Sequence, residues 1–291
     1  MITQDAPRFD AARYKETTRL QWDAAAEAWD RWAPLLQRWL GDATEQMLDM
    51  AGVKAGSRVL DVAAGAGDQT LMAAKRVGPH GRVLATDISA AILERAAAQA
   101  RHAGQHQVQV QALDGENLDV PPASFDAVIS RLGLIYFPDQ QRALAGMYKA
   151  LRPGGRVAAI VYTTPDRNGF FSIPVSVIRT RAGLGAPLPG QPGPFSLGGP
   201  GVLQAAFADA GFIDVAIRAL QAPVRTATAR DCVRFEQESF GALHQMLATL
   251  SDDAKAAAWE EITARLGQFE RGGRFEGPCE LMVGVGTRPM P

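Results

Sequence analysis

An acidic residue and two closely spaced glycines distinguish residues 59–68, which read VLDVAAGAGD. Asp61 lies in an apolar run, and Gly65 and Gly67 follow it. A carboxylate on a buried strand is costly unless something binds there. Glycines let the backbone approach a ligand closely, and the first turn of a following helix offers unpaired N–H groups to an anionic group. The spacing therefore predicts a small-molecule site at the end of a strand.

A second acid, Asp87, ends the next apolar run, GRVLATD at 81–87. Ligands of open α/β sheets bind beyond the carboxyl ends of the strands, so this acid is expected near the same site. Two cofactor classes compete there. A dinucleotide would want G-x-G-x-x-G, but Thr70 stands at the third glycine position. A carboxylate at Asp61 would repel a pyrophosphate and would suit a cofactor with a cationic amine and a sulfonium, while Asp87 could bind ribose hydroxyls.

Alternating strands and helices must position these residues. Short apolar runs predict strands, and periodic or capped stretches between them predict helices. The predicted strands are 58–64, 81–87, 108–114, 125–134 and 156–162. The predicted helices are 68–77, with Asp68 as its N-cap, then 89–104 and 139–151. This order predicts an α/β fold with a doubly wound, mostly parallel sheet.

The remaining segments are interpreted as additions to a single domain, 1–291. Residues 1–52 are expected to form an N-terminal helical cap, 53–223 the cofactor-binding core, and 279–287 a final strand. The turn-rich segment 164–201, with a short helix at 170–180, and the helical segment 224–278 are expected to be lids over the substrate.

Aromatic side chains are numerous in these additions. The lid phenylalanines could line an apolar pocket for an aromatic, quinone-like or terpenoid acceptor, although at least half of them are expected to form the core of the lid itself. Trp22, Trp29 and Trp32, on the predicted N-terminal helices, are interpreted as packing residues.

Composition excludes several classes of function. The 291 residues carry a net charge of −1, which argues against a nucleic-acid partner. The two cysteines, Cys232 and Cys279, show no CxxC spacing, so no metal site or disulfide framework is expected. The sequence shows neither a signal-peptide pattern nor an apolar run long enough to span a membrane. We therefore expect a cytoplasmic protein without membrane or nucleic-acid partners, in which a homodimer is an open alternative to the monomer.

Four blocks, in order, resemble the class I S-adenosylmethionine-dependent methyltransferases, and within them the ubiquinone/menaquinone-biosynthesis-type (methyltransferase type 11) branch. The blocks are VLDVAAGAGDQT, VLATDIS, ALDGENLDVPPASFDAVISRLGL and ALRPGGRVAAIVY. The resemblance covers about residues 55–220, and Ala64 stands where many members have Cys. The resemblance implies a Rossmann-like methyltransferase fold whose seven-stranded sheet has one antiparallel strand, here CELMVGVGT at 279–287.

The resemblance also implies roles for individual residues and S-adenosyl-L-methionine as the cofactor. Asp61 and the Gly65–Gly67 loop would hold its methionine end, Asp87 its ribose, and Asp114 with Gly115 its adenine. The full set expected to contact the cofactor is Asp61, Ala63, Gly65, Gly67, Gln69, Asp87, Ile88, Asp114, Gly115, Glu116 and Arg131.

No catalytic base is evident, and orientation of the two reactants could make one unnecessary. The weak candidates are His244, Tyr14, Tyr136 and Arg131. The function expected is methyl transfer to carbon or oxygen of a small, largely apolar molecule. Two alternatives stay open: an NAD(P)-dependent oxidoreductase, and a non-catalytic protein that binds S-adenosylmethionine.

Overall fold

A seven-stranded sheet forms the centre of the protein. The computed structural model describes residues 9–188 and 190–291, so the first eight residues of the expected cap lie outside it. The strands of the main sheet are β1 (Arg58–Val62), β2 (Arg82–Asp87), β3 (Val108–Ala112), β4 (Phe125–Arg131), β5 (Leu151–Tyr162), β6 (Ile213–Gln221) and β10 (Glu280–Thr287). Their order across the sheet is β3-β2-β1-β4-β5-β10-β6. The predicted α/β fold with a mostly parallel seven-stranded sheet is confirmed.

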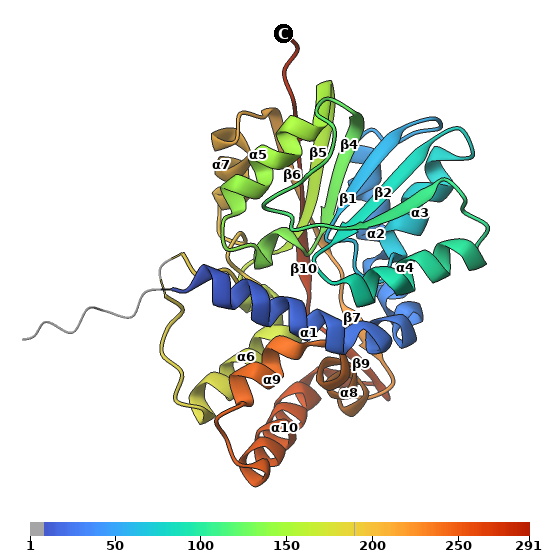
Figure 1. Ribbon diagram of the computed structural model, residues 1–291. Helices are drawn as coiled ribbons and strands as arrows, with labels where there is room; N and C mark the ends of the chain where they lie inside the picture. Colours follow the sequence, from blue (N-terminus) through green and yellow to red (C-terminus); the bar gives the residue numbers. More distant parts are fainter. Residues whose placement is uncertain (1–8, 189) are drawn as a thin grey trace, which may run out of the picture.

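The last strand, β10, is the antiparallel one, and it lies inside the sheet. Leu281 pairs with Tyr162 of β5 on one side and with Leu220 of β6 on the other. In Figure 1, β10 runs from the lid toward the end of the chain, against the direction of β5. The strands β1 to β5 are parallel, so their carboxyl ends share one edge of the sheet.

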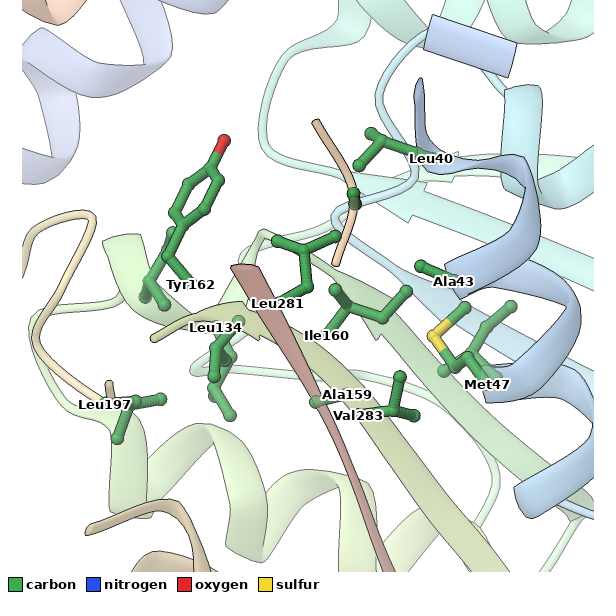
Figure 2. Packing of buried hydrophobic residues seen from close by; sticks show 14 of the residues in the cluster. Leu40, Ala43, Met47, Leu134, Ala159, Ile160, Tyr162, Leu197, Leu281 and Val283 are labelled. Atoms are coloured by element: carbon green, nitrogen blue, oxygen red, sulfur yellow. The ribbon is translucent and has the colours of Figure 1, made fainter. Parts of the chain in front are cut away.

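Helices cover the sheet and supply its core. The helices of this layer are α2 (Ala33–Met50), α3 (Asp68–Val77), α4 (Ala90–His102), α5 (Gln140–Ala150) and α7 (Val202–Asp209). Figure 2 shows Ala43 and Met47 of α2 beside Ile160 of β5 and Val283 of β10. These four side chains are fully buried, so α2 is packed firmly against the middle of the sheet.

The carboxyl-end edge of the sheet is covered by α1 (Ala11–Arg31), which lies across it between the sheet and the lid (Figure 1). The cap consists of two helices: α1 ends at Arg31, α2 begins at Ala33, and Pro34 lies in the first turn of α2. Proline suits the first turn of a helix, where its missing N–H is not needed.

The lid is built from α6 (Gly169–Arg181), α8 (Ala229–Ser239), α9 (Gly241–Leu247) and α10 (Asp252–Leu266), with a small sheet of β7 (Val224–Thr226), β9 (Arg274–Gly277) and β8 (Glu270–Arg271). The small sheet corrects the helical prediction for 224–278: its strands are too short to show a period and are held by pairing across the chain. No helix in the described part of the chain is both long and apolar enough to cross a membrane.

Candidate functional site

A cavity opens at the carboxyl ends of β1 to β5, beneath α1. It contains about 1130 Å³ of space free of atoms, counted together with its mouth. The residues that line it come from helices α1 to α4, the loops after the first four strands, the ends of β2, β4 and β5, and Phe240 next to the lid helix α9. Of the residues expected at the cofactor, those in the lining are Ala63, Gly65, Gln69, Asp87, Ile88, Asp114, Gly115 and Arg131.

The glycine loop between β1 and α3 has an unusual backbone. Ala63, Gly65 and Gly67 all have positive φ, at 60°, 57° and 93°. A Cβ on Gly67 would lie 2.8 Å from the Cβ of Ala96 in α4, whereas a Cβ on Gly65 would meet nothing within 4 Å. Gly67 therefore lets two helices approach each other, and Gly65 leaves backbone open beside the cavity.

Asp61 lies behind this loop and does not line the cavity. Its carboxylate accepts hydrogen bonds from Thr70 Oγ1 at 2.6 Å and from Gln69 Nε2 at 3.3 Å. Burial raises the pKa of Asp61 to about 7, against the opposing effect of those two hydrogen bonds and the charge of Arg131. In this arrangement Asp61 anchors the first turn of α3, and Gln69, rather than Asp61, faces the cavity.

Asp87 lies at the tip of β2 and lines the cavity. One of its oxygens accepts the N–H of Gly65 at 3.0 Å, and the other accepts the N–H of Ser89 at 3.0 Å. Burial raises its pKa, and the backbone donors oppose that shift. Asp87 thus connects the glycine loop to the neighbouring strand while it presents a carboxylate to the cavity.

The two acids after β3, Asp114 and Glu116, are bound by a lysine of α1 that was not predicted from the sequence. Lys15 Nζ, on α1, donates to Asp114 at 2.8 Å and to Glu116 at 2.7 Å. Burial by itself would raise the pKa of Asp114, but the hydrogen bonds from Lys15, Glu116 N–H and Asn117 lower it overall. Lys15, Asp114 and Gly115 line the cavity, whereas Glu116 is outside the lining.

Arg131, at the end of β4, forms a structural ion pair and also lines the cavity. Its Nη1 forms an ion pair with Asp68 at 2.7 Å and a hydrogen bond with Thr44 Oγ1 at 3.1 Å, and Arg131 and Asp68 also line the cavity. This pairing corrects the expected N-cap: α3 begins at Asp68, Gly67 is its N-cap, and the Asp68 carboxylate faces Arg131. The remaining guanidinium nitrogens can still serve a bound carboxylate.

The other weak catalytic candidates occupy different places. Tyr136 lines the cavity. Tyr14 does not; its ring packs edge-on against Phe9, and burial raises its pKa to about 12. His244 lies on the outer side of the lid, where Nε2 is 2.6 Å from the carbonyl of Gln237.

Several cavity residues were not predicted. Lys15, Trp22 and Trp29 all line the cavity from α1, so two tryptophans interpreted as packing also face the site. The three are spaced by seven residues, which places them on one face of a helix. That spacing was readable in the sequence. Tyr162, the last residue of β5, also lines the cavity, and of the lid phenylalanines only Phe240 is among the lining residues.

The strand order, the glycine loop and the position of the cavity define a Rossmann-like methyltransferase fold. Residues 38–173 match the model of the ubiE/COQ5 methyltransferase family. The resemblance to S-adenosylmethionine-dependent methyltransferases of the ubiquinone/menaquinone-biosynthesis branch is thereby confirmed.

Individual relatives agree with this placement over part of their length. The ubiquinone/menaquinone biosynthesis C-methyltransferase UbiE of Hahella chejuensis is 37% identical over 119 residues, which are 40% of this chain and 48% of that protein. The uncharacterized protein Rv1405c of Mycobacterium tuberculosis is 33% identical over 192 residues, 65% of each chain. The matched segment therefore spans about half the length of the UbiE relatives.

Solved structures share the fold at low identity. The YcgJ protein from Bacillus subtilis superposes with a TM-score of 0.56 at 20% identity, covering 86% of this chain and all of that one. The [4+2]-cyclase SpnF reaches a TM-score of 0.54 at 16% identity, covering 92% of this chain and 96% of that one. Because a protein named as a cyclase has the same fold, the activity has to be argued from the site.

Proposed function

We propose that this protein is an S-adenosylmethionine-dependent methyltransferase that acts on carbon or oxygen of a small, largely apolar molecule. The observation that carries the proposal is the cavity itself: the Gly65 loop and the Asp87 carboxylate form its floor at the switch from one strand to the next. The family match at 38–173 covers these same elements and supports this assignment.

The order of the strands suggests how the cofactor would lie. Asp114 and Gly115, beyond β3, would receive the adenine, and Asp87, beyond β2, the ribose hydroxyls. The loop after β1 and the free nitrogens of Arg131, beyond β4, would receive the methionine end. This arrangement follows one line along the edge of the sheet, because β3, β2, β1 and β4 are consecutive neighbours.

S-adenosylmethionine bound by these residues would supply a methyl group activated by its sulfonium, with the sulfur as the leaving group. The work of the protein is to orient the reactants and to exclude water. Alignment of the acceptor with the methyl group can contribute about 7–11 kcal/mol. Trp22, Trp29 and Phe240 cover the cavity and keep its wall apolar.

The acceptor class follows from that wall. Aromatic and aliphatic side chains form much of the lining, which favours an apolar acceptor over a charged peptide or a nucleic acid. A cytoplasmic location and a homodimer belong to the proposal only as expectations from the sequence.

A specific contact argues against the alternative of an NAD(P)-dependent oxidoreductase. Thr70, at the position of the third glycine, donates its hydroxyl to Asp61 beneath the loop, and both are buried. The loop is thus built around a buried carboxylate rather than around a glycine that lets a pyrophosphate approach.

Calorimetric titration of the protein with S-adenosylmethionine, S-adenosylhomocysteine and NADH tests the assignment. We expect the two sulfur nucleosides to bind and NADH not to bind. A screen of apolar acceptors with methyl-labelled cofactor then tests turnover. Tighter binding of NADH, or label transferred only to basic peptides or nucleic acids, would refute the proposal, and cofactor binding without any turnover would favour a non-catalytic binding protein.

A further inference from the structure

The ends of β4 and β5 bring two tyrosines into the cavity, on the side of β1 away from Asp87. Tyr136 follows β4 in the 3-10 turn η1 (Leu134–Tyr136), and Tyr162 ends β5. The strand order puts β2 and β3, with Asp87 and Asp114, on the other side of β1. The proposed cofactor places its adenine and ribose on that other side and reaches β4 only with its methionine end, at Arg131. The two tyrosines, beyond β4 and at the end of β5, therefore border the space left for the acceptor.

Aromatic rings form a continuous wall around this space. The ring centroid of Trp22 lies 6.1 Å from that of Tyr136 and 5.4 Å from that of Trp29. Trp29 lies in turn 6.2 Å from Phe240. These four residues and Tyr162 all line the cavity. A flat or ring-shaped apolar molecule fits such a wall, because aromatic faces and edges offer large contact areas.

The two tyrosine hydroxyls are polar groups set into this apolar wall. Neither has a hydrogen-bond partner within residues 9–188 and 190–291. In Figure 2 the ring of Tyr162 leaves the packed cluster of β5 and β10, and its hydroxyl oxygen is at the far end. Neither hydroxyl oxygen is among the fully buried polar atoms that lack a partner, so each is open to the cavity and can form a hydrogen bond with a bound ligand.

Both hydroxyls are donors at neutral pH. Burial raises the pKa of Tyr136 and that of Tyr162 far above the usual range for a phenol. Neither tyrosine can therefore take a proton from the acceptor as a tyrosinate. The carboxylates that line the cavity lie elsewhere: Asp68 pairs with Arg131, and Asp87 and Asp114 are on the cofactor side.

We propose that the hydroxyls of Tyr136 and Tyr162 donate hydrogen bonds to an oxygen function of the acceptor, which is an apolar ring or chain bearing a carbonyl or an ionised hydroxyl. This inference rests on the proposed function. Hydrogen-bond donors stabilise an ionised hydroxyl, so they lower the pKa of that hydroxyl. The acceptor can thus lose its proton to water before methyl transfer, and no protein base is needed at the aromatic wall.

Binding of two matched probes tests the proposal. We would titrate the protein, saturated with S-adenosylhomocysteine, with 2-naphthol and with naphthalene, which differ only in the oxygen. The wild type should bind 2-naphthol about tenfold more tightly than naphthalene. Tyr136→Phe and Tyr162→Phe should each reduce the affinity for 2-naphthol by about three- to tenfold. The affinity of the two variants for naphthalene should differ from that of the wild type by less than about twofold. Tyr148→Phe is the matched control, since Tyr148 packs against Phe212 outside the cavity.

A spectroscopic signature separates this role from a purely structural one. The pKa of bound 2-naphthol, followed by its fluorescence, should be lower than in water for the wild type and should rise again in both cavity variants. Equal affinity of the wild type for the two probes, or equal weakening of both probes in the variants, would overturn the inference. Failure of S-adenosylhomocysteine to bind would instead count against the proposed function, because that titration does not depend on the tyrosines.

Discussion

Asp87 is the residue on which the proposed cofactor site most depends. Its two oxygens are held by the N–H groups of Gly65 and Ser89, so the carboxylate is fixed in direction before any ligand arrives. We predict that Asp87→Asn weakens S-adenosylhomocysteine binding by at least about tenfold, because hydrogen bonds to a charged group are the stronger ones. Calorimetry measures the change. Asp119→Asn, an exposed acid in the same half of the chain, controls for charge, and unchanged affinity in Asp87→Asn would contradict the assignment.

Asp61 gives the protein a predictable response to pH. Its pKa is about 7 in the folded state and about 4 in an unfolded chain, so between these values the folded protein retains a proton that the unfolded chain has lost. The contribution of Asp61 to stability is therefore greatest below about pH 4 and declines as the pH rises to about 7.

The isosteric variant Asp61→Asn removes this titration. We predict that, between pH 5 and 7.5, the wild type loses free energy of unfolding relative to Asp61→Asn, by an amount on the order of a few kcal/mol. Urea unfolding of both proteins across that range measures it. The raised pKa of Asp87 affects the stability of the wild type and of Asp61→Asn in the same way, so it cancels in the difference between their free energies of unfolding. A difference that stays constant with pH would show that Asp61 keeps an ordinary pKa.

For single residues, the sequence predicted most of the cavity residues that follow a strand, because the residue types at the ends of predicted strands can be read directly from the sequence. It could not predict the direction of Asp61, which depends on whether Thr70 and Gln69 turn their side chains back beneath the loop. It could not predict Tyr162 either, because an aromatic residue at a strand end is as common in a core as in a site.

Polar contacts contribute much of the attachment of α1 to the core. Only Ala25, Ala26 and Ala28 of its 21 residues are buried. Lys15 binds the acids after β3, and Asp23 accepts a hydrogen bond from Ser89. Elements with few buried apolar contacts open at low free energy. We therefore expect α1 to separate from the sheet at low free energy.

We predict that Lys15→Met speeds amide exchange in the first turns of α1 by about two- to fivefold, the size expected for a partly exposed ion pair. Exchange in β1, β4 and β5 should stay as in the wild type. Hydrogen–deuterium exchange read by mass spectrometry measures both regions in one experiment. Lys75→Met, an exposed lysine on α3, is the control. Equal exchange of α1 in Lys15→Met and wild type would mean that its apolar contacts alone hold it.

Helices with a strong hydrophobic periodicity were predicted correctly from the sequence, whereas short strands that depend on pairing with distant strands were missed. The predicted helix 170–180 is confirmed as α6. The small sheet of the lid was missed, because β8 has two residues and β7 three. Likewise, the sequence predicts a helix that ends at 151 and a strand that begins at 156, whereas β5 begins at Leu151 with an irregular register opposite β4.

The whole molecule encloses the cavity between two layers that come from different parts of the chain. The strand ends and the loops after them supply the floor, and α1 with Phe240 supplies the cover. In Figure 1, α1 lies between the sheet and the lid. A ligand that touches both layers stabilises them together. We predict that S-adenosylhomocysteine at 100 times its Kd raises the free energy of unfolding by about 2.7 kcal/mol.

Amide exchange under the same conditions should slow in both α1 and the loop after β1. Denaturant unfolding with and without the nucleoside gives the energy, and exchange gives its distribution. NADH at the same concentration is the control. Protection confined to the sheet would show that α1 does not contact the ligand.

The interior position of β10 has a consequence for how the protein is made. Residues 280–287 separate β5 from β6, and every other strand of the sheet precedes them in the chain. A ribosome that has released β1 to β6 has therefore delivered a sheet with a gap, flanked by two open edges that can pair with other chains. Nascent molecules stay vulnerable to aggregation until this final stretch emerges, so a chaperone that shields those edges during translation would have its greatest effect late in synthesis.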